Sequence, residues 1–139
     1  MADVVEFELV SPERLVKSQP VDMVVVPCSE GDIGVMPGHS PLIGTVRPGV
    51  VDIHEDNKIV ESIFVSGGFV EVTPDRCTLL AEEAIVVGDL KADEAQSRLD
   101  AATESLAKAT ADSEKSNLEA EIAVAEGMLS ALGTGSKAH

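Results

Sequence analysis

Glycine and proline crowd into one stretch of the chain, residues 30–49, with the sequence EGDIGVMPGHSPLIGTVRPG. The stretch holds five of the chain's eleven glycines and three of its seven prolines. Glycine permits positive φ and close backbone approach, whereas proline fixes φ and removes a hydrogen-bond donor. Because so many residues with special backbone requirements lie between short apolar runs, the stretch is expected to adopt one particular looped shape. Because the stretch contains no nucleophile–base pair and no metal-ligand spacing, its residues predict a shaped surface rather than a reaction centre.

Proline and glycine also divide the chain into two parts with different hydrophobic periods. All seven prolines lie at or before Pro74, and eight of the eleven glycines lie at or before Gly88. Up to that point, short apolar runs recur about every 8–12 residues with turn signals between them, which is typical of a sandwich or barrel. Alanine, leucine, serine and charged residues dominate afterwards. We therefore expect a β-domain over residues 1–87 and a two-helix domain over residues 88–139.

The first part is predicted to be all β. The expected strands cover residues 5–9, 21–26, 33–36, 42–46, 50–54, 59–65, 69–72, 77–81 and 84–87. Residues 55–58 and 73–76 are expected to form hairpin turns. Residues 66–68 (Ser-Gly-Gly) precede a strand, so we interpret them as a bend between strands, because a phosphate-binding loop would open a helix.

The second part is predicted to be an antiparallel helical hairpin. Apolar residues repeat at intervals of three and four residues in a first seam. Its members are Ala92, Ala95, Leu99, Ala102, Leu106 and Ala109. A second seam follows a polar break over residues 110–116, and its members are Leu118, Ile122, Ala125, Leu129 and Leu132. Asp89 is expected to cap the first helix, and residues 133–135 are expected to end the second. The first seam is mostly alanine and buries little area, so a detachable hairpin and a permanently docked one both stay open.

Composition excludes several classes of partner. The chain has 139 residues and a net charge of −15, which makes nucleic acid and anionic lipid poor partners. Three phenylalanines are its only aromatic side chains, so platforms for stacking bases or sugars are not expected. The sequence has no apolar run long enough to span a membrane, and its acidic N-terminus does not resemble a signal peptide. A cytoplasmic protein is therefore expected.

The residues predict no catalytic site, no metal site and no cofactor. His39 lies in the glycine-rich stretch, but the other histidines, His54 and His139, do not complete a metal-binding spacing. A loop-shaping or interface role for His39 is the better interpretation. Cys28 and Cys77 are expected to be buried free thiols that behave as small apolar side chains.

The glycine-rich stretch resembles a signature of the epsilon subunit of F-type ATP synthases, which is called delta in mitochondria. The matching residues are Glu30, Gly31, Gly34, Pro37, Gly38, His39, Pro41, Leu42, Pro48 and Gly49. Residues 66–72 (SGGFVEV) and 80–84 (LAEEA) are similar to two further segments of that family. The resemblance covers the whole chain, since strands followed by an alanine-rich helical hairpin is the family's order.

The resemblance implies a β-sandwich of about ten strands in two sheets, followed by a two-helix domain. It also implies a non-catalytic rotor subunit in the central stalk of a proton-translocating ATP synthase, peripheral on the cytoplasmic face of the bacterial inner membrane. Such a subunit binds the gamma subunit and the polar loops of the membrane c-ring, and it links proton flow to ATP synthesis. Contact with the beta and alpha subunits through the helices is a further option. The residues implied at the c-ring or gamma interface are Glu30, Gly31, Asp32, Pro37, Gly38, His39 and Pro41.

The second part departs from the family pattern in two ways. Relatives that bind ATP open the first helix with Ile/Leu-Asp-x-x-Arg-Ala, whereas residues 90–95 here read LKADEA. Lys91 replaces the acidic residue and Glu94 replaces the arginine that can clamp phosphate, so no nucleotide site is expected. From Asp89 onward, ten acidic residues outnumber five basic ones. Because a mostly acidic hairpin is repelled by an acidic partner segment, this balance predicts that the helices inhibit ATP hydrolysis weakly at most.

Two other classes of protein compete with the rotor subunit. A small β-barrel hydrolase or isomerase would need a nucleophile–base pair or a metal set, and the sequence offers neither. A free-standing adaptor that uses the acidic surface and the helical hairpin is the stronger alternative. Co-purification with gamma and a c-ring would distinguish the rotor subunit from the adaptor.

Overall fold

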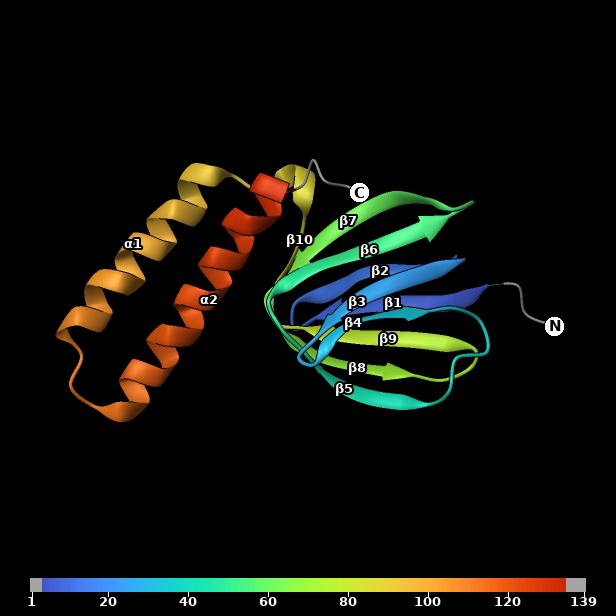
Figure 1. The fold of residues 1–139 in the computed structure, drawn as a ribbon, viewed down its shortest axis with the longest axis horizontal. Coiled ribbons are helices and arrows are strands. Elements are labelled where there is room, and N and C mark those ends of the chain that lie inside the picture. The colour runs from blue at the N-terminus through green and yellow to red at the C-terminus, as the bar shows by residue number, and fades with distance from the viewer. Residues whose placement is uncertain (1–3, 135–139) are drawn as a thin grey trace. The chain divides into compact units, whose positions relative to one another are not determined.

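The computed structural model describes residues 4–134 of the chain. Within this range ten strands are followed by a short 3₁₀ helix and two α-helices (Figure 1). The strands are β1 (Val5–Ser11), β2 (Arg14–Val21), β3 (Met23–Cys28), β4 (Gly31–Val35), β5 (Leu42–Val46), β6 (Gly49–Glu55), β7 (Lys58–Val65), β8 (Gly68–Val72), β9 (Arg76–Ala81) and β10 (Ala84–Val86). The helices are η1 (Val87–Asp89), α1 (Ala92–Lys108) and α2 (Asp112–Thr134). The chain divides into two compact units between Val86 and Val87.

The ten strands of the first unit form a sandwich of two five-stranded layers. One layer has the order β4-β3-β6-β7-β10 and the other has the order β5-β8-β9-β1-β2. Backbone pairing continues from one layer into the other at a single residue pair, Cys28 of β3 with Val46 of β5. Neighbouring strands are antiparallel except for β1 and β9, which run parallel. The predicted fold class, a sandwich of about ten strands in two sheets followed by two helices, is confirmed.

Alternating apolar residues place one face of each layer in a shared core. On β1 the side chains of Val5, Phe7 and Leu9 are fully buried, whereas the two glutamates between them are not. The other layer contributes side chains such as Ile53 and Ile63 to the same cluster. Removal of this apolar surface from water is the main force that holds the layers together.

An ion pair closes the sandwich at the edge away from the Cys28–Val46 junction. The Nζ atom of Lys17 on β2 lies 2.6 Å from Oε1 of Glu61 on β7. Both side chains are only about a quarter exposed, at 27% and 24%. The two layers are therefore connected by backbone pairing on one side and by side chains on the other.

Two features of the strands differ from the sequence prediction. No strand is predicted over residues 14–20, yet β2 occupies them as the outermost strand of its layer. An edge strand tolerates Pro20 and buries few side chains, which explains why its pattern is weak. The single predicted strand over residues 21–26 is wrong at its start, because Val21 ends β2 and Met23 begins β3. Between them, the carboxylate of Asp22 accepts a hydrogen bond from the backbone N–H of Asp56 at 2.8 Å.

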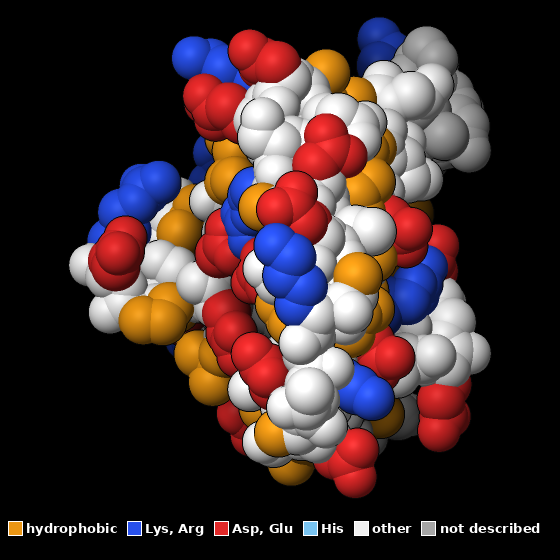
Figure 2. Space-filling view, turned by 90° about the vertical axis from the view of Figure 1, so that its left-hand side faces the viewer, with side chains coloured by type: hydrophobic (Ala, Val, Ile, Leu, Met, Phe, Trp, Pro, Cys, Tyr) orange, Lys and Arg blue, Asp and Glu red, His pale blue; other side chains and the backbone are white. Residues whose placement is uncertain are grey.

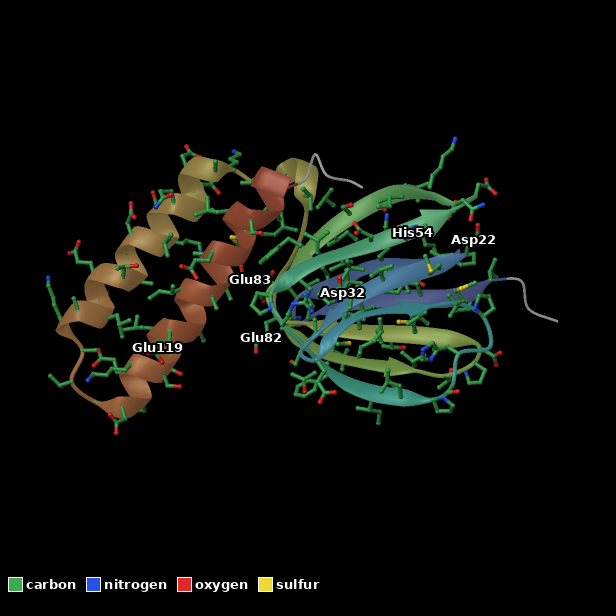
Figure 3. The ribbon with its side chains drawn as sticks, viewed as in Figure 1. Asp22, Asp32, His54, Glu82, Glu83 and Glu119 are labelled. Carbon is green, nitrogen blue, oxygen red and sulfur yellow. The ribbon has the colours of Figure 1, made fainter. Side chains whose placement is uncertain are left out.

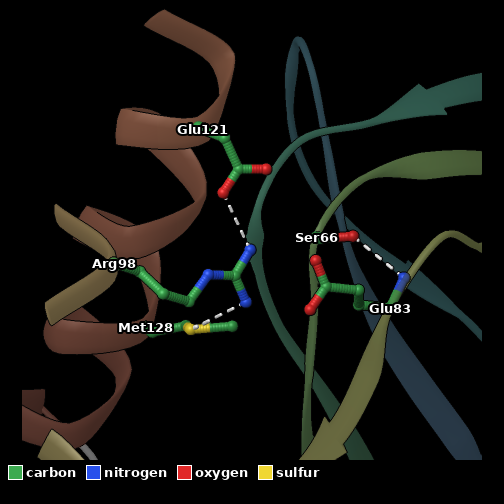
Figure 4. A network of polar contacts seen from close by, with 5 residues as sticks. All are labelled: Ser66, Glu83, Arg98, Glu121 and Met128. Atoms are coloured by element: carbon green, nitrogen blue, oxygen red, sulfur yellow. Dashed lines mark hydrogen bonds and ion pairs between the residues drawn. The ribbon is translucent and has the colours of Figure 1, made fainter. Parts of the chain in front are cut away.

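The second unit is the predicted antiparallel helical hairpin, with α1 and α2 joined by residues 109–111. Arg98 of α1 reaches across to α2, where it donates a 3.0 Å hydrogen bond to Glu121 and a weak 4.0 Å one to the sulfur of Met128 (Figure 4). The alanines at positions 95, 102 and 125 of the predicted seams are buried. No helix within residues 4–134 is long and apolar enough to cross a membrane.

Three details of the helices differ from the prediction. Asp89 lies in η1 and does not cap α1, because the N-cap residue is Lys91 and it makes no capping side-chain hydrogen bond. The α2 helix begins at Asp112, inside the expected polar break, since acidic residues are stabilised in the first turn of a helix. A second buried row on α2 lies outside the predicted seam, and its members are Val124, Met128 and Ala131. The α2 helix ends at Thr134, and Gly135 and the residues after it lie outside the described range.

Candidate functional site

The glycine-rich segment forms β4, β5 and the turns at both of their ends. Gly31 begins β4 with a φ of 135°, in a region that residues with a side chain rarely adopt. A Cβ atom added there would meet no other atom within 4 Å, so the backbone conformation and not the space requires glycine. The predicted shaped surface therefore starts from a strained backbone position at the turn between β3 and β4.

A hollow of about 480 Å³ opens between β4 and β5. Residues 28–33 line the hollow on the side of β4, and residues 42–45 line it on the side of β5. Glu30, Gly31 and Asp32, three of the predicted interface residues, are among them. Within residues 4–134, β4 pairs with β3 alone, so the edges of β4 and β5 that face the hollow are not bonded to each other.

Arg47 connects the turns beside this hollow. Its backbone N–H donates to the carbonyl oxygen of Pro27 at 2.9 Å. Its guanidinium donates from Nη1 to the carbonyl oxygen of Cys28 at 2.5 Å and from Nη2 to Oδ1 of Asp32 at 2.6 Å. A planar guanidinium can serve two acceptors at once in a fixed geometry. Asp32 lies at one end of the sandwich, opposite the end that carries Asp22 and His54 (Figure 3). The Asp32 carboxylate is therefore held in one place while its side chain stays 59% exposed.

The remaining predicted interface residues lie elsewhere. Pro37, Gly38, His39 and Pro41 belong to the loop between the far end of β4 and the start of β5. The backbone N–H of Gly38 donates to the carbonyl oxygen of Pro74 at 2.8 Å, which ties this loop to the turn between β8 and β9. Nδ1 of His39 donates to the neighbouring carbonyl oxygen of residue 40 at 2.7 Å. Since the five residues of β4 span about 17 Å, the acidic turn and the histidine loop are separate surfaces.

A row of apolar side chains crosses the outer face of the β5-β8-β9-β1-β2 layer. Phe69 of β8 pairs with Leu80 of β9, Leu80 pairs with Val10 of β1, and Val10 pairs with Leu15 of β2. We call these four residues the apolar row. Phe69, Leu80 and Leu15 are 60%, 52% and 56% exposed. A contiguous exposed apolar surface of this kind is typical of an interaction site.

The sequence prediction missed the apolar row, although the strand period contained the signal. Phe69 lies on the same face of β8 as Glu71, whereas Val70 and Val72 lie on the opposite face and are buried. An apolar residue that shares a strand face with a glutamate is expected to point outward. Only the pairing of two hairpins that are far apart in sequence, β1-β2 and β8-β9, brings the outward residues into one row.

Cys28 and Cys77 are free and buried, which confirms the prediction for both. Burial raises the pKa of the Cys77 thiol to about 12. Burial also raises the pKa of Cys28, an effect that the nearby Arg47 charge opposes and the Asp32 charge reinforces. Both thiols therefore stay protonated and unreactive at neutral pH. Among the residues that the structure describes, no cluster of three or more histidines, cysteines and acids could hold a metal ion.

The two residues that depart from the ATP-binding pattern pair with each other at the start of α1. Nζ of Lys91 lies 3.9 Å from Oε2 of Glu94, and both side chains are more than two-thirds exposed. A carboxylate accepts hydrogen bonds and cannot donate one to a phosphate. Other cations of the hairpin also pair within it, Lys108 with Glu104 at 3.7 Å and Arg98 with Glu121. Acidic and basic side chains lie among one another on the face that Figure 2 shows.

Comparison with known proteins gives a consistent set of matches. The family model of the beta-sandwich domain of the ATP synthase delta/epsilon chain matches residues 4–87. The ATP synthase epsilon chain of Rhodospirillum rubrum is 51% identical over 131 residues, which cover 94% of this chain and 98% of the relative. The ATP synthase epsilon chain of Paramagnetospirillum magneticum is 52% identical over 132 residues, with coverages of 95% and 99%.

Two solved structures have a similar fold at low sequence identity. A chain of the Euglena gracilis mitochondrial ATP synthase superposes with a TM-score of 0.80 at 19% identity, covering 95% of this chain and 83% of that one. A chain of the central stalk and c-ring assembly of the Tetrahymena thermophila mitochondrial ATP synthase superposes with a TM-score of 0.68 at 10% identity, with coverages of 92% and 96%.

Proposed function

Because this chain belongs to the ATP synthase delta/epsilon family, we propose that it is a non-catalytic rotor subunit in the central stalk of a proton-translocating F-type ATP synthase. Its relatives at 51% and 52% identity are epsilon chains of that enzyme, and the matches cover nearly their full lengths. Such a subunit connects gamma to the c-ring and transmits rotation, so that proton flow is coupled to ATP synthesis. It needs shaped and charged surfaces rather than a reaction centre.

The observation in this chain that carries the proposal is the apolar row. The sandwich has its own core between the layers, so the row is not needed to build that core. Large apolar side chains that lie in register across four strands, three of them exposed and Val10 half-buried, are typical of the centre of a stable protein interface. We assign the outer face of the β5-β8-β9-β1-β2 layer to gamma, which would cover the row and remove it from water.

We assign the turn with Glu30, Gly31 and Asp32 to the polar loops of the c-ring. The turn is acidic and exposed at one end of the sandwich, and the chain carries a net charge of −15, so a basic loop is a suitable partner. The loop with Pro37, Gly38, His39 and Pro41 lies about 17 Å away along β4 and cannot share one small contact with that turn. We therefore assign this loop to the gamma interface.

The helical hairpin contributes little regulation in this proposal. Lys91 and Glu94 pair with each other and offer no guanidinium for a phosphate, so the hairpin binds no nucleotide. Several of its cations pair with acids of the hairpin itself, which weakens any attraction to an acidic segment of the beta or alpha subunits. Membership of this complex implies a peripheral location on the cytoplasmic face of the bacterial inner membrane, with contact to the membrane only through the c-ring.

Co-purification from native membranes tests the proposal. The chain should remain bound to gamma and the c-ring after detergent extraction. Removal of the chain should reduce ATP-driven proton pumping, and addition of the purified chain should restore it. A free-standing acidic adaptor is the alternative, and it would be recovered as a monomer without gamma or the c-ring. That recovery, or proton pumping that does not depend on the chain, would contradict the rotor function.

A further inference from the structure

Arg47 is anchored at both of its ends beside the acidic turn. Its backbone N–H is bonded to Pro27, and its guanidinium is bonded to the carbonyl oxygen of Cys28 and to the carboxylate of Asp32. These contacts join the end of β3, the start of β4 and the turn that follows β5. Because the guanidinium has two acceptors on neighbouring segments, it has little freedom to leave Asp32 while the junction between the layers is intact.

The contribution of the Arg47–Asp32 ion pair to folding stability is too small to explain its short contact. Both side chains are well exposed, at 43% and 59%. Exposed ion pairs contribute little to the free energy of folding, because water screens the charges and ordering two side chains costs entropy. The 2.6 Å contact nevertheless fixes where the carboxylate lies, at the rim of the hollow between β4 and β5.

Arg47 also sets the charge that the acidic turn presents. Glu30 and Asp32 carry two negative charges, and Arg47 carries one positive charge beside them, so the group has a net charge of −1. Without Arg47 the same turn would present −2 and an Asp32 carboxylate with no fixed partner at this junction. The attraction between a charged turn and an oppositely charged surface depends on this local sum.

We infer that Arg47 is a positioning residue for the contact between Asp32 and a basic partner surface. It holds the Asp32 carboxylate at the rim of the hollow and shares it with the incoming cation. A lysine or arginine of the partner must compete with a guanidinium that is already bonded to Asp32. The charge attraction between the two surfaces is therefore limited, and their complementarity of shape determines the contact. The inference rests on the proposed function, in which this turn meets the c-ring.

The test measures binding of the full-length chain to membranes that carry the cognate complex stripped of this chain, at low and at high salt. Arg47→Gln should bind roughly two- to five-fold more tightly at low salt, and its affinity should fall more steeply with added salt. Arg47→Lys keeps the positive charge beside the turn, so its salt dependence should stay close to that of the native chain, although a lysine cannot bond both acceptors in the fixed geometry of the guanidinium. Lys58→Gln is the matched control, because it removes one positive charge at the other end of the sandwich and should leave the salt dependence unchanged.

A second pair of variants separates positioning from a general structural role. Asp32→Asn should weaken binding and flatten its salt dependence. In the Asp32→Asn background, Arg47→Gln should tighten binding less than it does in the native chain, because only the Glu30 charge remains on the turn. Thermal unfolding verifies that each variant is folded. Asp32→Asn changes only an exposed side chain, so this variant still tests the inference if Arg47→Gln does not fold. Unchanged binding of Asp32→Asn would overturn the inference.

The remaining outcomes distinguish this inference from the proposed function. If Arg47→Gln weakens binding equally at all salt concentrations, with or without Asp32, Arg47 has only a structural role and the inference fails. If the native chain binds and Arg47→Gln matches it at every salt concentration, the inference fails while the proposed function stands. If the native chain does not bind the stripped membranes at all, both are overturned.

Discussion

Phe69 of β8 lies directly opposite Leu80 of β9, and both side chains point away from the core into solvent. Cross-strand apolar pairs usually stabilise a sheet by packing on one another. Here the pair continues through Val10 and Leu15 into two more strands, which is more apolar surface than a sheet needs on its wet face. Burial of apolar area contributes roughly 25 cal/mol per Å², so a partner that covers the row would gain substantial free energy.

Replacement of Gly68 by alanine should destabilise the sandwich severely. Gly68 begins β8 with a φ of 145°, and a Cβ atom there would lie 1.9 Å from the carbonyl oxygen of Leu80. That overlap involves backbone and cannot be relieved by rotating a side chain. We expect Gly68→Ala to lose at least about 3 kcal/mol in the free energy of unfolding by urea titration.

Gly44→Ala is the matched control, because a Cβ atom at Gly44 would have its nearest neighbour at an ordinary 3.7 Å. Its effect should stay below about 1 kcal/mol. Equal urea midpoints for the Gly68 and Gly44 variants would show that the backbone contact at Gly68 is not the constraint we describe.

Stability should decline in alkali because of Cys77. Burial raises the pKa of this thiol from about 9 to about 12, so above pH 9 the thiol ionises in the unfolded chain before it ionises in the folded one. The stability that this group contributes is complete below about pH 9 and is lost as the pH rises toward 12. The loss has a slope of up to about 1.4 kcal/mol per pH unit.

Cys77→Val should show a shallower decline over this range, measured by denaturant unfolding at a series of pH values. The chain has no tyrosine, which removes one class of side chain that titrates there. Cys28 acts in the same direction, so the slope should shrink without vanishing. A Cys77→Val slope equal to that of the native chain would contradict this account.

A fragment of residues 1–87 should fold without the helices. All members of the sandwich core cluster lie between Val5 and Ala81, so the core is complete in the fragment. We expect a single cooperative unfolding transition, and we expect ATP hydrolysis by a complex assembled with the fragment to show no strong activation. A fragment without a cooperative transition would contradict the predicted domain limit, and strong activation of hydrolysis would contradict weak inhibition by the hairpin.

The full-length chain should not bind ATP in the micromolar range. Lys91 and Glu94 form an exposed pair at the start of α1, and the carboxylate repels a phosphate where an arginine would bind it. Isothermal titration calorimetry should detect no saturable heat with ATP and Mg²⁺. A micromolar dissociation constant would show that the hairpin binds nucleotide by another set of residues.

Local patterns were sufficient to predict most of the fold. Alternation of apolar residues located strands such as β1 and β9, and the intervals of three and four residues located both helices. The β2 strand was missed because an edge strand buries few side chains, so its apolar period is weak. The cap at Asp89 was wrong because a 3₁₀ turn precedes α1, and a local rule does not reveal that turn.

The candidate site was less accessible from sequence because it depends on contacts between distant segments. From the sequence, Arg47 is recognisable only as part of a turn, because its hydrogen bonds to Cys28 and Asp32 connect residues that are 19 and 15 positions apart. The apolar row requires the parallel pairing of β1 with β9, which are about 70 residues apart, and no local period encodes such a pairing. The resemblance predicted which residues form the interface, but it did not reveal that β4 separates them into two surfaces.

The most direct test of the rotor assignment is the affinity of the full-length chain for the cognate gamma subunit. A variant with Phe69→Asp and Leu80→Asp places two charges in the apolar row and should bind gamma at least about 100-fold more weakly, because buried apolar anchors dominate interface energies. Val60→Asp, at a 54% exposed valine of β7 in the other layer, should bind like the native chain. Native affinity in the Phe69 and Leu80 variant would contradict the account.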